Sequence, residues 1–350
     1  MTSNVKRSVV CLVLLLGLLS MTAIGANKNR IGTSGAQELL IPVGARGIAL
    51  GFSGSLFIKG LDAIYWNPAG LSRMDNSVEV MFSQMSYIAD IGVSYGAVGV
   101  KVGEFGHLGF TLKSLSFGDI PVTTELYPDG TGANYSPAFI TLGLTYSKML
   151  TDRISVGATA NMISEKILDV SATGVCFDFG VQYQNLGMQG LALSVAIKNV
   201  GPNMKFDGSG TYKTATAEDG SIRGQQTLKT ELANFEMPSN LEIGLAFTPK
   251  LDENNNLAVS AAFRNNNYAE DEYNLGAEYT FMDMMFLRGG YTFSPQTDLD
   301  PTGTKGYIYD WSLGMGVHYN AGGVDLSFDY AYRNVKYFDG NQTFTLKVGF

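Results

Sequence analysis

From residue 77 onward, apolar and polar residues alternate one by one in a series of short stretches separated by turn residues. In the last of these stretches, Phe344, Leu346, Val348 and Phe350 alternate with small or polar residues. Because successive side chains of a β-strand point to opposite faces, each stretch predicts a strand with one apolar and one polar face. We predict fourteen such strands, at residues 77–88, 91–102, 105–117, 137–150, 153–165, 169–183, 188–200, 238–248, 255–264, 271–281, 284–293, 306–319, 322–333 and 341–350.

The connections between these strands differ in length according to their place in the series. Those after even-numbered strands are short, whereas the long ones, at 118–136, 201–237 and 294–305, follow strands 3, 7 and 11. Outer-membrane β-barrels have short periplasmic turns and longer external loops, but a soluble β-sandwich has no reason for such an alternation. The sequence therefore predicts an all-β fold, a 14-stranded antiparallel transmembrane β-barrel, in which the last strand closes against the first.

The last predicted strand also ends on an aromatic residue. In this it resembles the closing strand of bacterial outer-membrane barrels, which the barrel assembly machinery recognises. We predict that Phe344, Leu346, Val348 and Phe350 form this assembly signal and face the lipid of the outer membrane. An edge strand of a soluble sandwich is the alternative interpretation, which the connection lengths disfavour. The expected location is the bacterial outer membrane, which the chain crosses many times.

The second predicted strand is less regular than the others. Val93 and Tyr95 belong to one phase of the alternation, whereas Val98 belongs to the other. Gly96 and Gly99 lie where the phase changes. Glycine inside a strand often marks a bulge or a bend, so a bulge or kink is expected at these two residues.

Two segments precede the predicted strands. Residues 1–25 have the pattern of a secretory signal peptide, with Lys6 and Arg7 before an apolar run that ends in small residues. Residues 26–76 are apolar but are interrupted by glycines and prolines, so they need another surface to pack against. We predict that they form an N-terminal hatch, or plug, inside a barrel formed by residues 77–350.

Composition agrees with a membrane barrel. Of the 350 residues 16% are charged and 11% are aromatic, whereas about a quarter of a soluble protein is charged. Beyond the signal peptide no run approaches the roughly 20 apolar residues of a membrane helix. The formal net charge of −8 offers no basic surface, so nucleic acid is not an expected partner.

No pattern in the sequence predicts an enzyme, a cofactor or a metal site. With the signal peptide removed, Cys176 is the only cysteine, and a small inward-facing filler is its expected role. The long loops carry acidic residues that lack the ligand spacing of a calcium site. Among them are Asp119, Asp129, Asp298 and Asp300.

The candidate functional residues lie in the hatch and on the polar faces of the strands. Asn67, Pro68, Ala69 and Gly70 predict a rigid turn that seals the lumen, although an ordinary turn or a ligand contact would use the same residue types. The lumen-facing charges are of both signs, so we expect them to pair with each other or with Arg46 and Asp62 of the hatch. These charges are Glu79, Lys113, Asp178, Glu242, Arg264, Glu278, Arg288, Asp310, Asp329, Arg333 and Lys347.

Parts of the sequence resemble a known family. IPVGARGIALG at 41–51 and DAIYWNPAGL at 62–71 resemble the start of PorV/PorQ family proteins. Further matches are LTDRISVG at 150–157, DFGVQY at 178–183 and KNVGP at 198–202. That family is similar to the long-chain fatty acid transporters (FadL-like), which are fourteen-stranded barrels with an N-terminal hatch that carries an Asn-Pro-Ala motif.

The resemblance implies two functions. A protein of PorV/PorQ type would be a non-enzymatic component of type IX protein secretion, holding secreted cargo proteins or translocon partners with its three long loops. The alternative is a FadL-like channel for uptake or export of small hydrophobic molecules. A channel of this kind is expected to show an apolar cavity that leads to a lateral gap beside the irregular second strand.

Overall fold

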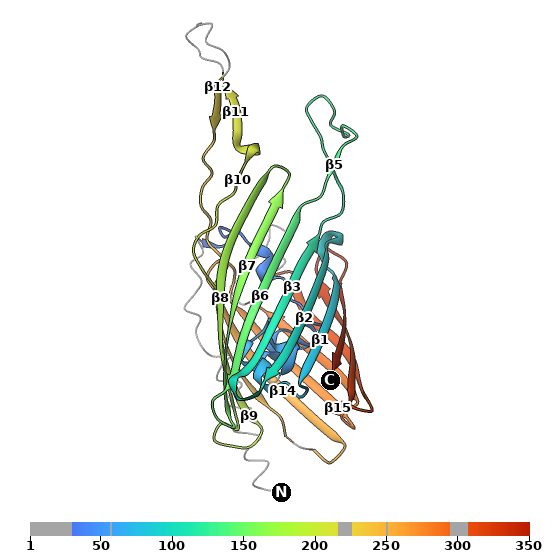
Figure 1. The fold of residues 1–350 in the computed structure, drawn as a ribbon. Coiled ribbons are helices and arrows are strands. Elements are labelled where there is room, and N and C mark those ends of the chain that lie inside the picture. Colours follow the sequence, from blue (N-terminus) through green and yellow to red (C-terminus); the bar gives the residue numbers. More distant parts are fainter. Residues whose placement is uncertain (1–29, 57, 216–225, 250, 295–306) are drawn as a thin grey trace.

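The computed structural model describes residues 30–56, 58–215, 226–249, 251–294 and 307–350 (Figure 1). The predicted signal peptide, most of the loop at 294–305, and with it Asp298 and Asp300, lie outside the described residues. The main sheet has 15 strands, one of which, β10, only adds to the edge of β8. The other 14 pair antiparallel in sequence order, and β1 pairs with β19, so they form a closed barrel.

Each wall strand overlaps one of the predicted strands, so the predicted fold class is confirmed. The wall consists of β1 (Val78–Ser86), β2 (Gly92–Val102), β3 (Gly106–Ser116), β6 (Ala138–Met149), β7 (Ile154–Ile167), β8 (Val170–Gln184), β9 (Leu191–Val200), β13 (Asn240–Phe247), β14 (Asn255–Asn266), β15 (Glu272–Phe281), β16 (Met285–Phe293), β17 (Tyr309–Ala321), β18 (Val324–Val335) and β19 (Asn341–Gly349). The short elements outside the hatch are β4 (Ile120–Pro121), β5 (Asn134–Tyr135), β10 (Asp207–Gly208), β11 (Tyr212–Ala215), β12 (Gln226–Lys229), η6 (Ile88–Asp90), η7 (Gly103–Phe105) and η8 (Ser209–Thr211).

The two ends of the barrel differ. Short turns gather at one end, which we call the turn end, and the long connections gather at the other, which we call the loop end. At the loop end the hairpins β4–β5 and β11–β12 stand well above the rim (Figure 1). Among the described residues, no helix is long and apolar enough to cross a membrane.

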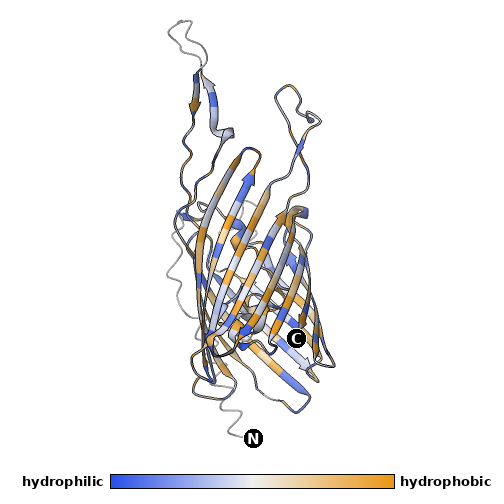
Figure 2. Ribbon diagram, in the orientation of Figure 1, coloured by the Kyte–Doolittle hydropathy of each residue, from blue (hydrophilic) through white to orange (hydrophobic). Residues whose placement is uncertain are grey.

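The outer surface of the wall is apolar because the strands alternate. In β3, for example, Leu108, Phe110 and Leu112 point outward and are exposed, while the residues between them face the interior. Hydrophobic and hydrophilic residues accordingly alternate along the strands in Figure 2. At the turn end, the rings of Phe105 and Tyr146 lie 5.1 Å apart on this surface, as in the aromatic girdle that borders the lipid band of such barrels.

The predicted closure between the last strand and the first is confirmed. β1 and β19 pair over eight residues without a shift, from Glu79 with Gly349 to Ser86 with Gln342. The backbone of Phe350 extends this ladder, since its N–H donates to the carbonyl of Val78 at 2.8 Å and its carbonyl accepts from Ser77 N–H at 2.9 Å.

Removing Phe350 is therefore expected to lower the amount of folded barrel. The deletion removes the last backbone hydrogen bonds of the closing ladder and an exposed aromatic ring. We propose that the barrel assembly machinery recognises this ring. The measurement is the folded fraction in the outer membrane, determined by semi-native gel electrophoresis, with Phe350→Tyr as the control. Wild-type levels of folded protein in the deletion variant would contradict the prediction.

The expected bulge at Gly96 and Gly99 is not found. β2 pairs with β1 and with β3 through both glycines without a register shift. The alternation is regular in space: Val93 and Tyr95 face inward and are buried, whereas Val98 faces outward and is exposed. The apolar phase changes because the inward-facing Val93 and Tyr95 pack in the core with the hatch, whereas at Gly99 the side chain of Leu61 comes so close that the inner position carries no side chain. The change in the alternation therefore reflects what each face of β2 contacts, and it does not mark a break in the strand.

Residues 30–76 pass through the barrel from the loop end to the turn end. The backbone N–H of Gly35 donates to Glu236, at the base of a long loop, while Arg73 donates to the carbonyl of Arg153 in a short turn. We call this segment the hatch, drawn in blue inside the wall in Figure 1. Its helical turns are η2 (Gln37–Leu40), α2 (Ala45–Ala49), η3 (Ser53–Leu56), η4 (Gly60–Ala63) and η5 (Pro68–Arg73).

The main hydrophobic core lies between the hatch and the wall. α2 contacts β16 to β19, η3 contacts β9 and β13 to β15, η4 contacts β1 and β2, and η5 contacts β3 and β6 to β8. Ile48, Leu61, Trp66 and Leu71 of the hatch are fully buried in this core. Each such side chain contributes about 1.5–3 kcal/mol when it is removed from water. The hatch is therefore held around most of its circumference by apolar packing.

Candidate functional site

The turn at 67–70 is fixed to the wall by one asparagine. Asn67 precedes η5, and its side-chain oxygen accepts from the backbone N–H of Ala69 at 3.0 Å. This is the capping arrangement expected where a proline begins a helical turn. The side-chain nitrogen of Asn67 donates to Ser194 Oγ at 2.7 Å and to the carbonyl of Val195 at 3.3 Å. The same side chain therefore caps the start of η5 and attaches it to β9.

Two wall glycines make room for this turn. Gly157 in β7 and Gly180 in β8 are opposite each other in the ladder and face the interior. A Cβ on Gly157 would lie 2.5 Å from the carbonyl oxygen of Pro68, and one on Gly180 would lie 2.8 Å from Cγ of Asn67. The turn thus lies directly on strand backbone. Gly99 has a related role, because a Cβ there would lie 2.7 Å from the side chain of Leu61.

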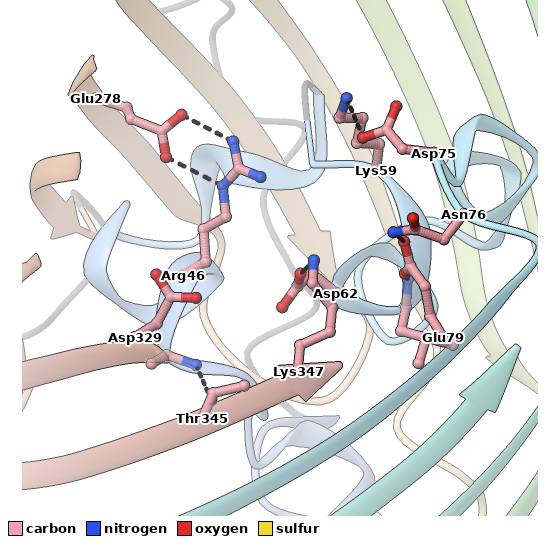
Figure 3. Close-up of polar contacts among 12 residues, drawn as sticks. Arg46, Lys59, Asp62, Asp75, Asn76, Glu79, Glu278, Asp329, Thr345 and Lys347 are labelled. Carbon is pink, nitrogen blue, oxygen red and sulfur yellow. Dashed lines mark hydrogen bonds and ion pairs between the residues drawn. The ribbon is translucent and has the colours of Figure 1, made fainter. Parts of the chain in front are cut away.

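Buried ion pairs join the hatch to the wall near the turn end (Figure 3). The guanidinium of Arg46 binds the carboxylate of Glu278 at 2.8 Å and 3.0 Å. Arg288 binds the same carboxylate at 2.6 Å and reaches Asp329 at 2.5 Å. The predicted pairing of wall charges with Arg46 is thereby confirmed, and four residues form one chain of alternating charges.

A second pair links Asp62 to the closing strand, as predicted. The Lys347 ammonium donates to the Asp62 carboxylate at 2.5 Å (Figure 3). Burial alone raises the pKa of Asp62, but the charge and hydrogen bond of Lys347 outweigh it and hold that pKa below its usual range. Farther along the wall, Arg264 pairs with Glu242 at 2.8 Å and with Glu272 at 3.1 Å.

The remaining polar groups of the interior contact the hatch in other ways. Lys113 donates to the backbone carbonyls of Glu38 and Ile41, each at 2.5 Å. The ammonium of Lys198, a residue that the sequence analysis did not single out, lies 3.7 Å from the centre of the Tyr65 ring. Lys198 could have been found from the sequence, because the alternation in its strand places it among the residues that face the lumen.

A cavity of about 1080 Å³ opens below the hatch at the turn end. It is lined by the ion-paired groups Arg46, Asp62, Glu278 and Lys347 with Glu79, and by apolar side chains, among them Phe247, Leu251, Phe286 and Val317. This vestibule is therefore mixed in character, and the hatch forms its roof. A pocket that reaches the second strand at Tyr95 has a volume of only about 40 Å³, which is too small for the expected apolar cavity.

The wall ladder has a bulge between β8 and β9. Phe179 pairs with Ile197, but the next rung joins Phe177 to Val200, so β9 carries one extra residue. Asn199 has a φ of 59°, and its N–H donates to the carboxylate of Asp178 at 2.7 Å. Asparagine is one of the few residues that adopt a left-handed conformation readily.

Beyond this bulge the two strands separate. β9 ends at Val200, whereas β8 continues to Val170, where β10 pairs with it. Buried apolar residues fill the interval, and we call them the seam cluster. They are Ala36, Leu39, Ile163, Ala172, Cys176, Met204 and Met237, with Phe206 and Phe235 packed against them. Cys176 has the buried filler position predicted for it.

Parts far apart in the sequence form the seam cluster. Ala36 and Leu39 belong to the hatch, whereas Met204 and Met237 come from the two ends of one long loop. Both methionines pack over Gly174 of β8, where a Cβ would lie within 2.8 Å of Met237. Hatch and loop together therefore close the place where the wall has no continuous ladder.

Neither the family models nor the curated proteins searched contain a match to this sequence. The CymD monoaromatic hydrocarbon channel matches 88% of this chain and 97% of its own, with 16% identity and a TM-score of 0.53. The Pseudomonas putida toluene transporter TodX matches 87% of this chain and 96% of its own, with 15% identity and a TM-score of 0.54. This chain shares their fold.

The comparisons bear differently on the two families that the sequence resembles. A Pseudomonas aeruginosa FadL homologue also matches, over 88% of this chain and 98% of its own, with 15% identity and a TM-score of 0.47. The predicted likeness to transport barrels is confirmed for the fold by CymD and TodX. The resemblance to PorV/PorQ proteins, and with it type IX secretion, finds no support in any of the comparisons.

Proposed function

We propose that the protein is a channel of the bacterial outer membrane that passes small hydrophobic molecules, with its turn end in the periplasm. The observation that supports this proposal most directly is the seam cluster, an apolar filling at an interruption of the wall ladder. The shared fold with channels described for monoaromatic hydrocarbons points to the same class of solute.

An apolar path is needed because a hydrophobic solute gains nothing from charged surroundings. The vestibule at the turn end places buried ion pairs beside its apolar side chains, so a hydrophobic solute there meets charged groups as well as apolar contacts. The seam cluster offers apolar contacts between the hatch and the outer face of the wall. Methionine is flexible and polarisable, so Met204 and Met237 can rearrange around solutes of different shapes. In the described conformation these side chains are buried and the seam is closed.

Locking the loop to β8 is expected to abolish transport. Ser171 and Asp207 are partners in the β8–β10 ladder, beyond the seam cluster. The Cα–Cα distance of such an antiparallel pair lies within the range that a disulfide spans. The variant carries Ser171→Cys and Asp207→Cys in a Cys176→Ala background. Toluene uptake by proteoliposomes should fall to the level of empty vesicles on oxidation and return on reduction.

The control keeps a disulfide but moves it away from the wall. Thr214 and Thr227 are partners in the β11–β12 hairpin, so Thr214→Cys with Thr227→Cys locks the hairpin alone and should leave uptake unchanged. Equal uptake by the oxidised and reduced forms of the Ser171→Cys, Asp207→Cys variant would refute passage through the seam.

The hairpins at the loop end favour a second candidate function. β4–β5 and β11–β12 project beyond the rim and expose large apolar side chains, among them Leu126, Tyr127, Tyr212 and Leu228. We propose as the alternative that they hold secreted proteins or translocon subunits. Replacing residues 209–230 by a short glycine-serine link should then release proteins that co-purify with the wild-type barrel. An identical set of co-purifying proteins would refute this alternative.

A further inference from the structure

A second pocket opens at the turn end, beside the last residues of η5. Its volume is about 430 Å³, and we call it the rim pocket. Hatch residues form one side and the ends of β2, β3 and β6 form the other. The lining residues are Ser72, Arg73, Met74, Lys101, Gly103, Glu104, Gly106, His107, Lys148 and Met149.

The rim pocket is basic, although the protein as a whole is acidic. Arg73, Lys101 and Lys148 line it, with Glu104 as the only carboxylate among the lining residues. Within the described part of the chain, none of these three cations forms an ion pair. The one side-chain hydrogen bond of Arg73 goes to the carbonyl of Arg153, at 3.1 Å. Arg46, Arg288 and Lys347, deeper in the lumen, are instead paired with carboxylates.

A buried imidazole points to a missing partner in the same pocket. His107 is only 7% exposed, and neither of its ring nitrogens has a hydrogen-bond partner among the described residues. Nε of Arg73 is also buried without a partner. Buried polar groups are nearly always hydrogen-bonded, so these atoms and the unpaired cations indicate a ligand that accepts hydrogen bonds and carries negative charge.

We propose that the rim pocket binds a phosphate group, held between Arg73 of the hatch and Lys101, His107 and Lys148 of the wall. Guanidinium groups bind phosphate oxygens in pairs, and lysines add point charges. The source of the phosphate is either the headgroup of a phospholipid or a soluble phosphate. The aromatic pair Phe105 and Tyr146 lies beside the pocket on the outer face, which places the pocket at headgroup depth and favours the lipid.

Such a ligand would join the hatch to the wall. Arg73 ends η5, whereas Lys101 and Lys148 belong to β2 and β6. Phosphate between them would therefore add a contact that exists only while η5 stays in place. A ligand that binds only the folded protein raises the stability of the protein, and this effect grows with the concentration of the ligand.

Unfolding of the purified full-length barrel in a non-ionic detergent tests the proposal. The midpoint of heat unfolding is measured with no addition, with inorganic phosphate, and with short-chain phosphatidylglycerol. The wild-type midpoint should rise with phosphatidylglycerol and should not rise in the Arg73→Gln, Lys101→Gln variant. Each charge-assisted hydrogen bond lost should weaken binding about tenfold.

The controls separate this effect from net charge and from misfolding. Lys205→Gln with Lys229→Gln removes two cations at the loop end and should keep the full rise. Lys148→Gln, at the rim, should fold normally and show a reduced rise. A rise with phosphatidylglycerol alone identifies the lipid as the source, and an equal rise with inorganic phosphate identifies a soluble phosphate. An unchanged wild-type midpoint with both additions, or equal rises in the wild type and the pocket variant, would overturn the proposal.

Discussion

Replacing Gly157 by alanine is expected to make the barrel leak. The added Cβ would lie 2.5 Å from the carbonyl oxygen of Pro68 and 2.6 Å from the backbone nitrogen of Ala69. These are backbone atoms, so no side-chain rotation can relieve the contact, and η5 must move off β7. Overpacking of this kind costs about 1–3 kcal/mol. Single-channel recordings in planar bilayers should show openings that the wild type lacks, and cells should become sensitive to bulky polar antibiotics.

Two other glycines provide matched controls for this substitution. A Cβ on Gly289 would meet Leu313 at 3.6 Å, an ordinary contact, and one on Gly96 would meet nothing within 4 Å. Gly289→Ala and Gly96→Ala should therefore remain as closed as the wild type. If Gly157→Ala is equally closed while correctly folded, the turn at 67–70 does not seal the lumen.

Replacing Glu278 by alanine should cause the largest loss of stability. One carboxylate serves both Arg46 and Arg288, so its removal leaves two buried guanidinium groups without their shared partner. Breaking a buried ion pair from one side costs about 3–5 kcal/mol. The free energy of unfolding, measured by urea titration of the barrel in lipid vesicles, should fall by this amount. Glu278→Gln keeps an acceptor oxygen and should lose less.

An exposed ion pair gives the comparison. Asp207 pairs with Lys229 at 2.7 Å on the surface of the loop end, and surface pairs contribute little. Asp207→Ala is therefore expected to leave the unfolding curve unchanged. Equal losses for Glu278→Ala and Asp207→Ala would mean that the lumen screens its charges as well as bulk water does.

The strands could be predicted from the sequence because each face of the wall has a constant environment over most of its length. Phe110 and Leu346, for example, lie exposed on the outer face while their neighbours face the interior. The bulge predicted for β2 at Gly96 and Gly99 was wrong because the inner positions of this strand meet the apolar hatch instead of a polar lumen, so apolar residues occur on both faces. The true bulge, at Asn199, leaves only a one-residue disturbance in the alternation, which is too short to recognise.

The candidate site was only partly predictable for a related reason. Asn67 and Pro68 predict a turn from local chemistry alone, and the structure places both of them in a capped, buried turn. The roles of Gly157 and Gly180 depend on what packs against them, which no local pattern records. Met204 belongs to a loop that appears polar in sequence, and its burial follows from contacts with the hatch some 170 residues earlier in the chain.

The bond between Asp62 and Lys347 has a consequence for the order of folding. The hatch is synthesised first, yet its partners include the last strand: Asp62 binds Lys347, and the N–H of Ala45 donates to Thr345 at 2.9 Å across a sequence separation of 300 residues. Contacts between such distant residues form late and slowly. We therefore expect these contacts of the hatch to form only when β19 joins the wall, so that closure of the barrel and fixation of the hatch at this strand occur together.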